Sequence, residues 1–268
     1  MAERTIETRK GIRVRVREAG SGPSLVYLHG ISGLLDPEPL LDRLAEQFRV
    51  HAPVWPGYGE EEGEERIEDM LDFTLHGLDV LEALELERPH LVGHSFGGMI
   101  AAEMASLASA AVDRLVLLAP YGLWHDESPI EDVFATTPFH LSKLLFSDAE
   151  QGQKVLTAGL DFSHDGALTD FMVSNARRLG TAGKVLFPIP NRRLSKRLYR
   201  LAAETLIVWG SADRLIPPAY AGHWQALLPH AQCEEIEGAA HMLQAEQPAA
   251  VAETIAKFLR ATDGASGR

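Results

Sequence analysis

Short apolar segments alternate with amphipathic segments of helical period along most of this chain. The apolar segments read SLVYLH, RVHAPVW, PHLVG, DRLVLLAP, ETLIVWG and QCEEIE, and helical patterns between and after them include residues 67–84, 219–228 and 248–261. Such alternation favours parallel strands, because their crossover connections are long enough to hold a helix. Two earlier segments, RTIET and IRVRVRE, have only a short turn between them and predict an antiparallel start. We therefore predict an α/β fold, a mostly parallel sheet of about eight strands with helices on both faces.

The alternation is interrupted between residues 121 and 203. This stretch contains helical patterns such as FHLSKLLF and ALTDFMVSNARRL and no convincing strand. We interpret residues 121–203 as a helical cap inserted after the sixth strand, with residues 1–120 and 204–268 forming the core domain. Large apolar side chains in the cap are candidates to line a substrate pocket, although packing within the cap explains each one singly. The candidates are Trp124, Phe139, Phe171 and Met172.

Composition and charge exclude several classes of partner. The 268 residues carry a formal net charge of −13, which disfavours nucleic acid because phosphate binding needs a basic surface. No segment resembles an apolar secretion signal or a membrane span. With Cys233 as the one cysteine, no internal disulfide is possible, and we expect a cytoplasmic protein. The acidic run at residues 60–65 is interpreted as a solvated loop rather than a cation site. The sequence does not indicate the oligomeric state.

One serine lies between glycines where a buried strand turns into a helix. The sequence LVGHSFGGMIAAEMA places Ser95 at that junction, with Gly93 and Gly97 two residues to either side. This is the pattern of a nucleophile elbow, a sharp strand-to-helix turn that exposes the serine hydroxyl. A plain helix N-cap would also explain the serine, but it would leave both glycines unexplained. We therefore predict that Ser95 is a nucleophile.

A serine nucleophile needs a base, and the sequence offers one at the same edge of the sheet. His241 lies in a Gly/Ala loop after the last predicted strand, and Asp213 follows the preceding strand. The carboxyl ends of parallel strands share one edge, so we expect both side chains to meet Ser95 there. Asp213 would orient the imidazole and stabilise its charged form. Taken singly, Asp213 could instead be a turn residue and His241 a surface loop histidine.

An oxyanion on the substrate would need two backbone donors. The elbow supplies one from Phe96, the residue after the serine, and the loop YLHGISG after the third strand supplies a second from Ile31. His29 is interpreted as a residue that braces this loop. His94 is a variable position of the elbow, and we assign it no catalytic role.

These segments together resemble the α/β-hydrolase superfamily, in particular its capped serine esterase-like branch. The resemblance extends from about Arg4 to Ala261 and is carried by LHGISG, WPGYG, GHSFGG, GSADRLIPP and GAAHMLQAEQP, with the order Ser95, Asp213, His241. It implies an α/β-hydrolase fold and an acyl-enzyme mechanism without metal or cofactor.

Several positions depart from relatives within that superfamily. Val54 and Trp55 stand where many members carry an acidic residue, so bracing of the His29 loop must differ. A serine at position 95 excludes the aspartyl-ester chemistry of the haloalkane dehalogenases and epoxide hydrolases that the chain resembles, and Ser32 replaces a proline usual in epoxide hydrolases. The elbow also differs from the GNSMGG form of carbon–carbon bond hydrolases.

The expected function is hydrolysis of a small or medium carboxylic ester, so the chain is expected to be a carboxylesterase acting on a small-molecule ester. The same catalytic groups would also serve a lactone, a thioester, the carbon–carbon bond of a diketone acid, or perhydrolysis. A non-catalytic receptor on a hydrolase scaffold is the alternative from a different class, because a fold does not dictate function. A dehydrogenase is excluded, since GHSFGG lacks the glycine spacing that a dinucleotide needs.

Overall fold

An eight-stranded sheet forms the centre of the molecule. The computed structural model describes residues 1–187 and 193–261. In these residues the strand order is β1-β2-β4-β3-β5-β6-β7-β8. The first two strands and the β2–β4 pair are antiparallel, and all pairs from β4 to β8 are parallel. The predicted α/β fold with a mostly parallel sheet is therefore confirmed. The strands are β1 (Ala2–Glu7), β2 (Arg13–Ala19), β3 (Ser24–Leu28), β4 (Arg49–Pro53), β5 (His90–His94), β6 (Arg114–Leu118), β7 (Glu204–Gly210) and β8 (Gln232–Ile236).

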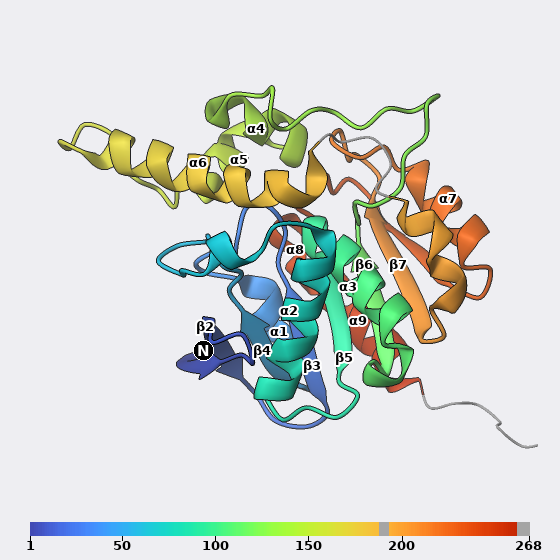
Figure 1. The fold of residues 1–268 in the computed structure, drawn as a ribbon. Coiled ribbons are helices and arrows are strands. Elements are labelled where there is room, and N and C mark those ends of the chain that lie inside the picture. The colour runs from blue at the N-terminus through green and yellow to red at the C-terminus, as the bar shows by residue number, and fades with distance from the viewer. Residues whose placement is uncertain (188–192, 262–268) are drawn as a thin grey trace, which may run out of the picture.

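Helices cover both faces of the sheet (Figure 1). Helices α2 and α3 are in contact with each other, and so are α1 and α9. The helices are α1 (Pro39–Leu44), α2 (Met70–Ala83), α3 (Phe96–Leu107), α4 (Pro138–Leu145), α5 (Ala149–Leu156), α6 (Ala167–Leu186), α7 (Tyr220–Leu227), α8 (Leu243–Glu246) and α9 (Pro248–Arg260), and short 3₁₀ helices span Glu64–Arg66, Ser109–Ala111, Leu194–Lys196 and Leu198–Arg200. None of the described helices is long and apolar enough to cross a membrane.

The centre of the sheet is the most deeply buried part of the core. Every residue of β5 and β6 is buried, and α3 is buried from Phe96 to Ser106. Small side chains on α3 let the helix approach the strands closely: a Cβ on Gly98 would lie 3.0 Å from the backbone oxygen of Gly93 on β5. The edge strand β8 differs, because only its last residue, Ile236, is buried. Ser95 therefore lies at the junction of two deeply buried elements, β5 and α3.

Helices fill the described part of the chain between β6 and β7. This segment contains α4, α5 and α6 and no strand, and it lies across the carboxyl ends of the parallel strands (Figure 1). We call it the helical insertion. Its expected boundaries at residues 121 and 203 stay a prediction. Residues 188–192 within it, and residues 262–268 of the expected core domain, lie outside the described residues.

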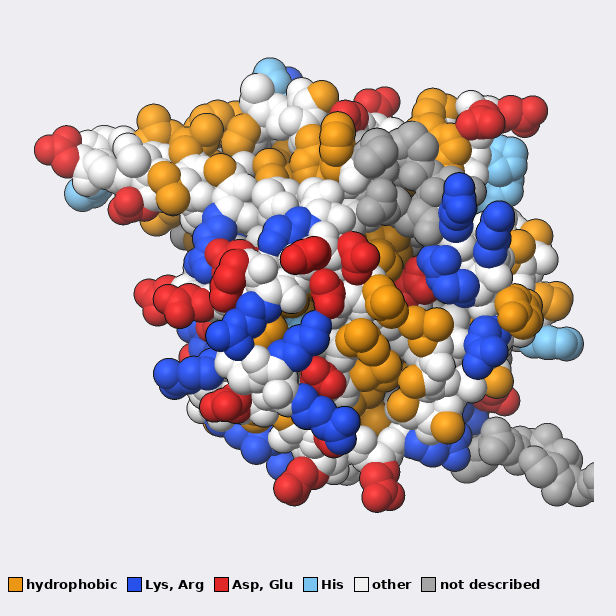
Figure 2. Space-filling model, viewed as in Figure 1, with side chains coloured by type: hydrophobic (Ala, Val, Ile, Leu, Met, Phe, Trp, Pro, Cys, Tyr) orange, Lys and Arg blue, Asp and Glu red, His pale blue; other side chains and the backbone are white. Residues whose placement is uncertain are grey.

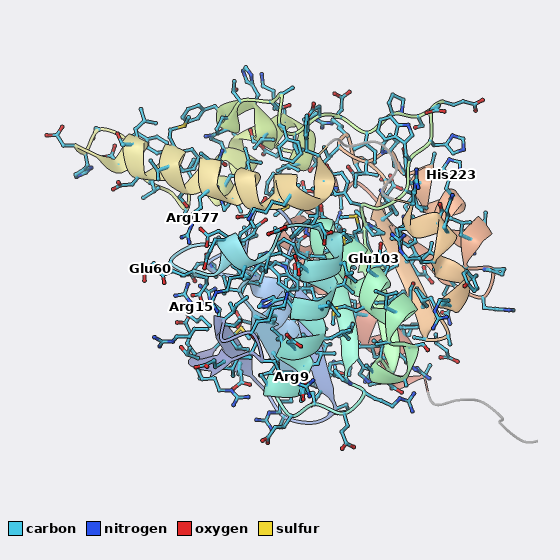
Figure 3. All side chains as sticks on the ribbon, viewed as in Figure 1. Arg9, Arg15, Glu60, Glu103, Arg177 and His223 are labelled. Carbon is cyan, nitrogen blue, oxygen red and sulfur yellow. The ribbon has the colours of Figure 1, made fainter. Side chains whose placement is uncertain are left out.

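The helical insertion is held to the core by basic side chains of α6. Arg177 donates to both carboxylate oxygens of Glu64, at 2.7 and 2.9 Å, and to the backbone oxygens of Gly59 and Glu61. Lys184 donates to the backbone oxygens of Glu64 and Ile67. Red and blue side chains accordingly gather along the lower side of α6 in Figure 2, and Arg177 lies above the loop of Glu60 in Figure 3. Part of the acidic run at residues 60–65 thus anchors α6. The interpretation of this run as a solvated loop did not anticipate that contact.

Candidate active site

Ser95 has an unusual backbone conformation at the turn between β5 and α3. Its φ is 55° and its ψ is −116°, in a region that residues with a Cβ rarely adopt. Neighbouring backbone groups fix this conformation. The Ser95 N–H donates to the Leu118 oxygen at 2.8 Å, and the Ser95 oxygen accepts from the N–H of Tyr121 at 3.1 Å. The hydroxyl is therefore presented by a rigid, strained turn.

The two flanking glycines are required by close backbone contacts. A Cβ on Gly93 would lie 2.6 Å from the backbone oxygen of Gly97, and a Cβ on Gly97 would collide with the backbone oxygens of Leu28 and His29. The turn can therefore form only with glycine at both positions, as the pattern of the elbow implied.

Of the three residues singled out in the sequence for catalysis, His241 lies within hydrogen-bond distance of both Ser95 and Asp213. His241 Nε2 is 2.8 Å from Ser95 Oγ, and His241 Nδ1 is 2.8 Å from Asp213 Oδ2. All three side chains are buried, and the serine is 2% exposed. A histidine held between a carboxylate and a hydroxyl can remove the hydroxyl proton as the oxygen attacks a carbonyl carbon.

Asp213 is fixed by the loop that follows β7. Its Oδ1 accepts hydrogen bonds from the N–H groups of Leu215 and Ile216, at 2.9 and 3.0 Å, while Oδ2 faces His241. Both carboxylate oxygens are thus satisfied without solvent. Because the two oxygens have different partners, the carboxylate cannot rotate without breaking three hydrogen bonds.

His94 contacts both the backbone and the ring of His241. Its Nε2 donates to the backbone oxygen of His241 at 2.9 Å, and the two rings are 5.1 Å apart. Burial, with the nearby His241 ring as a second cause, lowers the pKa of His94 to about 3, so it stays neutral at ordinary pH. Sequence reasoning left this residue without a role. Its place at the end of a buried strand, directly before Ser95, was the available signal.

His29 braces the loop between β3 and α1, as its interpretation from the sequence suggested. Its Nε2 accepts from the Trp55 N–H at 3.1 Å, its Nδ1 donates to the Gly30 oxygen at 2.8 Å, and the Trp55 indole N–H donates to the His29 oxygen. Burial lowers the pKa of His29 to about 4. Trp55 thus helps to brace this loop. It stands at one of the two positions where many members of the superfamily that the sequence resembles carry an acidic residue.

The loop after β3 places Ile31 beside Ser95. A Cβ on Gly30 would lie 3.2 Å from the Ser95 Cβ, so the two turns are in close contact. Phe96 is the first residue of α3, and within residues 1–187 and 193–261 neither its N–H nor that of Ile31 donates a hydrogen bond. Both groups are available for an acceptor on a bound molecule.

A cavity that is partly open to solvent adjoins Ser95 and His241. Its apolar wall comes mainly from the helical insertion, which contributes Val133, Pro138, Leu141, Leu145, Leu156, Phe171 and Leu179, and the core adds Ile31, Leu215 and Met242. A mainly apolar lining beside a few polar side chains suits a small organic molecule. The polar residues Ser32, Asn175 and Arg178 also line it, and the sequence analysis named none of them as a pocket residue.

Of the four expected pocket residues, one lies in the wall of this cavity. Phe171 lines it, whereas Trp124, Phe139 and Met172 do not. Phe139 and Met172 are 42% and 41% exposed, and orange side chains lie along the outer side of these helices in Figure 2. The Trp124 indole instead donates to Asp126 at 2.7 Å. Helical spacing identified apolar positions but not the face that α4 and α6 turn toward Ser95.

The described part of the chain contains no group of three or more His, Cys, Asp or Glu side chains placed to hold a metal ion. Cys233 is exposed and lies on β8.

The chain is similar to known hydrolases in both sequence and fold. The sequence model of the α/β-hydrolase fold family matches residues 23–248. A 2-hydroxymuconate semialdehyde hydrolase of Pseudomonas sp. strain CF600 is 27% identical over 96% of this chain and 93% of its own length. Among solved structures, a bacterial membrane phospholipase A superposes with a TM-score of 0.81 at 22% identity over 96% of this chain and 85% of that one. A carboxylesterase from Bacillus subtilis superposes with a TM-score of 0.72 at 21% identity over 97% and 92%. At these identities the two structures show the fold alone.

Proposed function

The chain belongs to the α/β-hydrolase family, and from this premise we propose that it is a serine hydrolase that cleaves small or medium carboxylic esters. The observation that carries the proposal is the continuous chain of hydrogen bonds from Asp213 through His241 to Ser95, which ends at an apolar cavity. An apolar cavity beside a nucleophile favours an ester with an apolar acyl or alcohol part.

In the proposed mechanism, Ser95 Oγ attacks the ester carbonyl carbon while His241 Nε2 accepts the hydroxyl proton. Asp213 holds the imidazole and stabilises its positive charge. The carbonyl oxygen becomes an oxyanion and accepts hydrogen bonds from the N–H groups of Ile31 and Phe96. Collapse of the intermediate expels the alcohol, which takes the proton from His241, and leaves an acyl group on Ser95.

Water completes the reaction through the same groups. His241 removes a proton from water as the water oxygen attacks the acyl carbon. The second oxyanion then collapses and releases the carboxylic acid, and Ser95 Oγ takes the proton back from His241. No metal or cofactor takes part in the proposed reaction.

The proposal is tested with p-nitrophenyl acetate, butyrate and octanoate on the wild type and on Ser95→Ala. We expect turnover by the wild type and a fall in kcat of about 10³-fold or more in the variant, because a triad member is lost. Ser174→Ala is the matched serine control: Ser174 is exposed on α6 and does not line the cavity, so its loss should leave kcat unchanged. Equal activity of the wild type and Ser95→Ala would overturn the proposal.

Hydrolysis of a carbon–carbon bond in a diketone acid is a second candidate. It is favoured by the relative named 2-hydroxymuconate semialdehyde hydrolase, which is aligned over nearly its full length. Turnover of a diketone acid without turnover of any ester would select it. A panel of lactones, thioesters and peracid-forming conditions separates the other acyl reactions, and saturable ligand binding without turnover would indicate a receptor.

A further inference from the structure

Arg178 lines the same cavity as Ser95 and has an unused hydrogen-bond donor. It lies on α6, where its Nη1 donates to the Ser32 backbone oxygen at 2.9 Å and its Nη2 donates to the Asn175 side-chain oxygen at 3.1 Å. Its Nε is buried and has no hydrogen-bond partner. A buried donor without a partner is costly, which points to an acceptor that joins it in the working protein.

Arg178 also lacks a counter-ion. Among the described residues, no carboxylate lies within ion-pair distance of its guanidinium. Its neighbour Arg177 pairs with Glu64, and Arg197 pairs with the buried Glu103. Burial lowers the pKa of Arg178, but a guanidinium stays charged at neutral pH. A partly buried cation that is balanced only by neutral oxygens is well placed to bind an anion.

The cavity around Arg178 is otherwise apolar or neutral. Of the residues that line it in the described chain, Arg178 is the one with a permanent charge. The planar guanidinium can bind both oxygens of a carboxylate, and low-dielectric surroundings strengthen such a pair. The whole chain carries a net charge of −13 and repels anions at long range, so a preference for an anionic substrate would have to come from this local cation.

We infer that the substrate carries a carboxylate in addition to the bond that is cleaved, and that Arg178 binds this carboxylate. The inference rests on the proposed function and narrows its substrate class to carboxylate-bearing esters. Arg178 is then a specificity residue, because it selects the substrate and takes no part in bond cleavage.

A different role for Arg178 would follow from its bond to Ser32, the residue after Ile31. In that role it would only position the loop that supplies the oxyanion donor. Loss of the side chain would then slow every ester by the same factor. Binding of a carboxylate, in contrast, changes the ratio between an acid and its neutral counterpart.

The experiment compares matched acid and amide substrates. Mono-p-nitrophenyl esters of glutaric, adipic and pimelic acid place the carboxylate on the acyl side, and each is paired with its terminal primary amide. The pair 4-acetoxybenzoic acid and 4-acetoxybenzamide places it on the alcohol side. Rates are measured at neutral pH in moderate salt, which screens the net charge, and the rate with Ser95→Ala is subtracted as background.

We expect the wild type to prefer at least one acid over its amide in kcat/KM by about 10- to 100-fold, through KM more than kcat. Arg178→Met should abolish the preference, and Arg178→Lys should retain part of it because it keeps the charge but not the fork. Arg43→Met is the matched control: it removes the same charge from an exposed arginine on α1, outside the cavity, and should leave the ratio unchanged.

Two results would overturn the inference. One is a wild type that prefers no acid over its amide in any pair, a result that needs no variant to fold. The other is an equal fall of acid and amide rates in Arg178→Met. Neither result touches the proposed serine hydrolase, which stands or falls with the difference between the wild type and Ser95→Ala on neutral esters.

Discussion

Ser95 shows how a single residue can store strain at a rigid point in the fold. A backbone in this region costs about 1–3 kcal/mol and persists only where the surroundings fix it. Here β5 and α3 provide that support, together with backbone hydrogen bonds from β6 and the segment that follows it. His94 adds a neutral hydrogen bond to His241 without competing for its proton. The reactive geometry is thus set mainly by backbone atoms.

The first prediction concerns Asp213→Asn. If the asparagine oxygen keeps the Leu215 and Ile216 N–H groups, its NH₂ must face His241 Nδ1 and forces the proton onto Nε2, so the ring cannot accept the Ser95 proton. We expect kcat to fall by about 10⁴-fold with KM little changed. Steady-state kinetics with p-nitrophenyl butyrate measures this.

The matched control for that change is Asp148→Asn. Asp148 also accepts two backbone N–H bonds, from Glu150 and Gln151, but it is exposed and caps α5. Its replacement should leave kcat unchanged. A similar loss in both variants, or a loss below about tenfold in Asp213→Asn, would contradict the role of Asp213.

Among the helices, close packing at α3 contrasts with open surroundings in α6. A Cβ on Gly97 of α3 would collide with the backbone of Leu28, the last residue of β3, and of His29. A Cβ on Gly180 of α6 would meet nothing within 4 Å. The same substitution should therefore have opposite effects in the two helices. The difference reflects their roles: α3 carries the elbow, and the middle of α6 is partly exposed.

The second prediction is made for these two glycines. Gly180→Ala should raise the free energy of unfolding by about 0.5–1 kcal/mol, because alanine has the higher helix propensity. Gly97→Ala should lower it by several kcal/mol or prevent folding, because the Leu28 carbonyl cannot move away within the sheet. Urea denaturation measures both. An Ala at position 97 that folds as stably as the wild type would refute the account of the elbow.

The elements differ in how far the sequence could predict them. Strand patterns, the elbow and the loops that carry Asp213 and His241 are local signals, and the topology of a parallel sheet brings their ends together. The side of α6 that turns toward the cavity is not determined by the local sequence. Phe171 and Met172 are adjacent and both apolar, and only docking of the helix through Arg177 and Lys184 decides that Phe171 turns inward. Arg178 was missed for the same reason.

At the scale of the whole molecule, buried histidines link folding to pH. Burial lowers the pKa of His29 and His76 to about 4 and that of His94 to about 3, from 6.5. As pH falls below 6.5, the unfolded chain binds protons at these sites while the folded chain does not. Stability is therefore lost between pH 6.5 and about 4. Glu38 acts in the opposite sense, since burial raises its pKa to about 7, and it offsets part of the loss that the three histidines cause.

The third prediction follows from His76, which lies away from the cavity and has no hydrogen-bond partner on either nitrogen. His76→Leu should reduce the dependence of unfolding free energy on pH, between pH 6.5 and 4, by about one proton. Denaturant unfolding at several pH values measures the slope. An unchanged slope would show that His76 is not the source of the acid sensitivity assigned to it.

The most direct test of the central claim, that Ser95 is the nucleophile, is covalent labelling with diethyl p-nitrophenyl phosphate followed by mass spectrometry. The account predicts one diethylphosphoryl group per chain, located on Ser95 by peptide mapping, with release of one equivalent of p-nitrophenol. Labelling should be absent in Ser95→Ala and much slower in His241→Ala, because the base that activates the hydroxyl is lost. An adduct on another residue, or equal labelling of Ser95→Ala, would contradict the account.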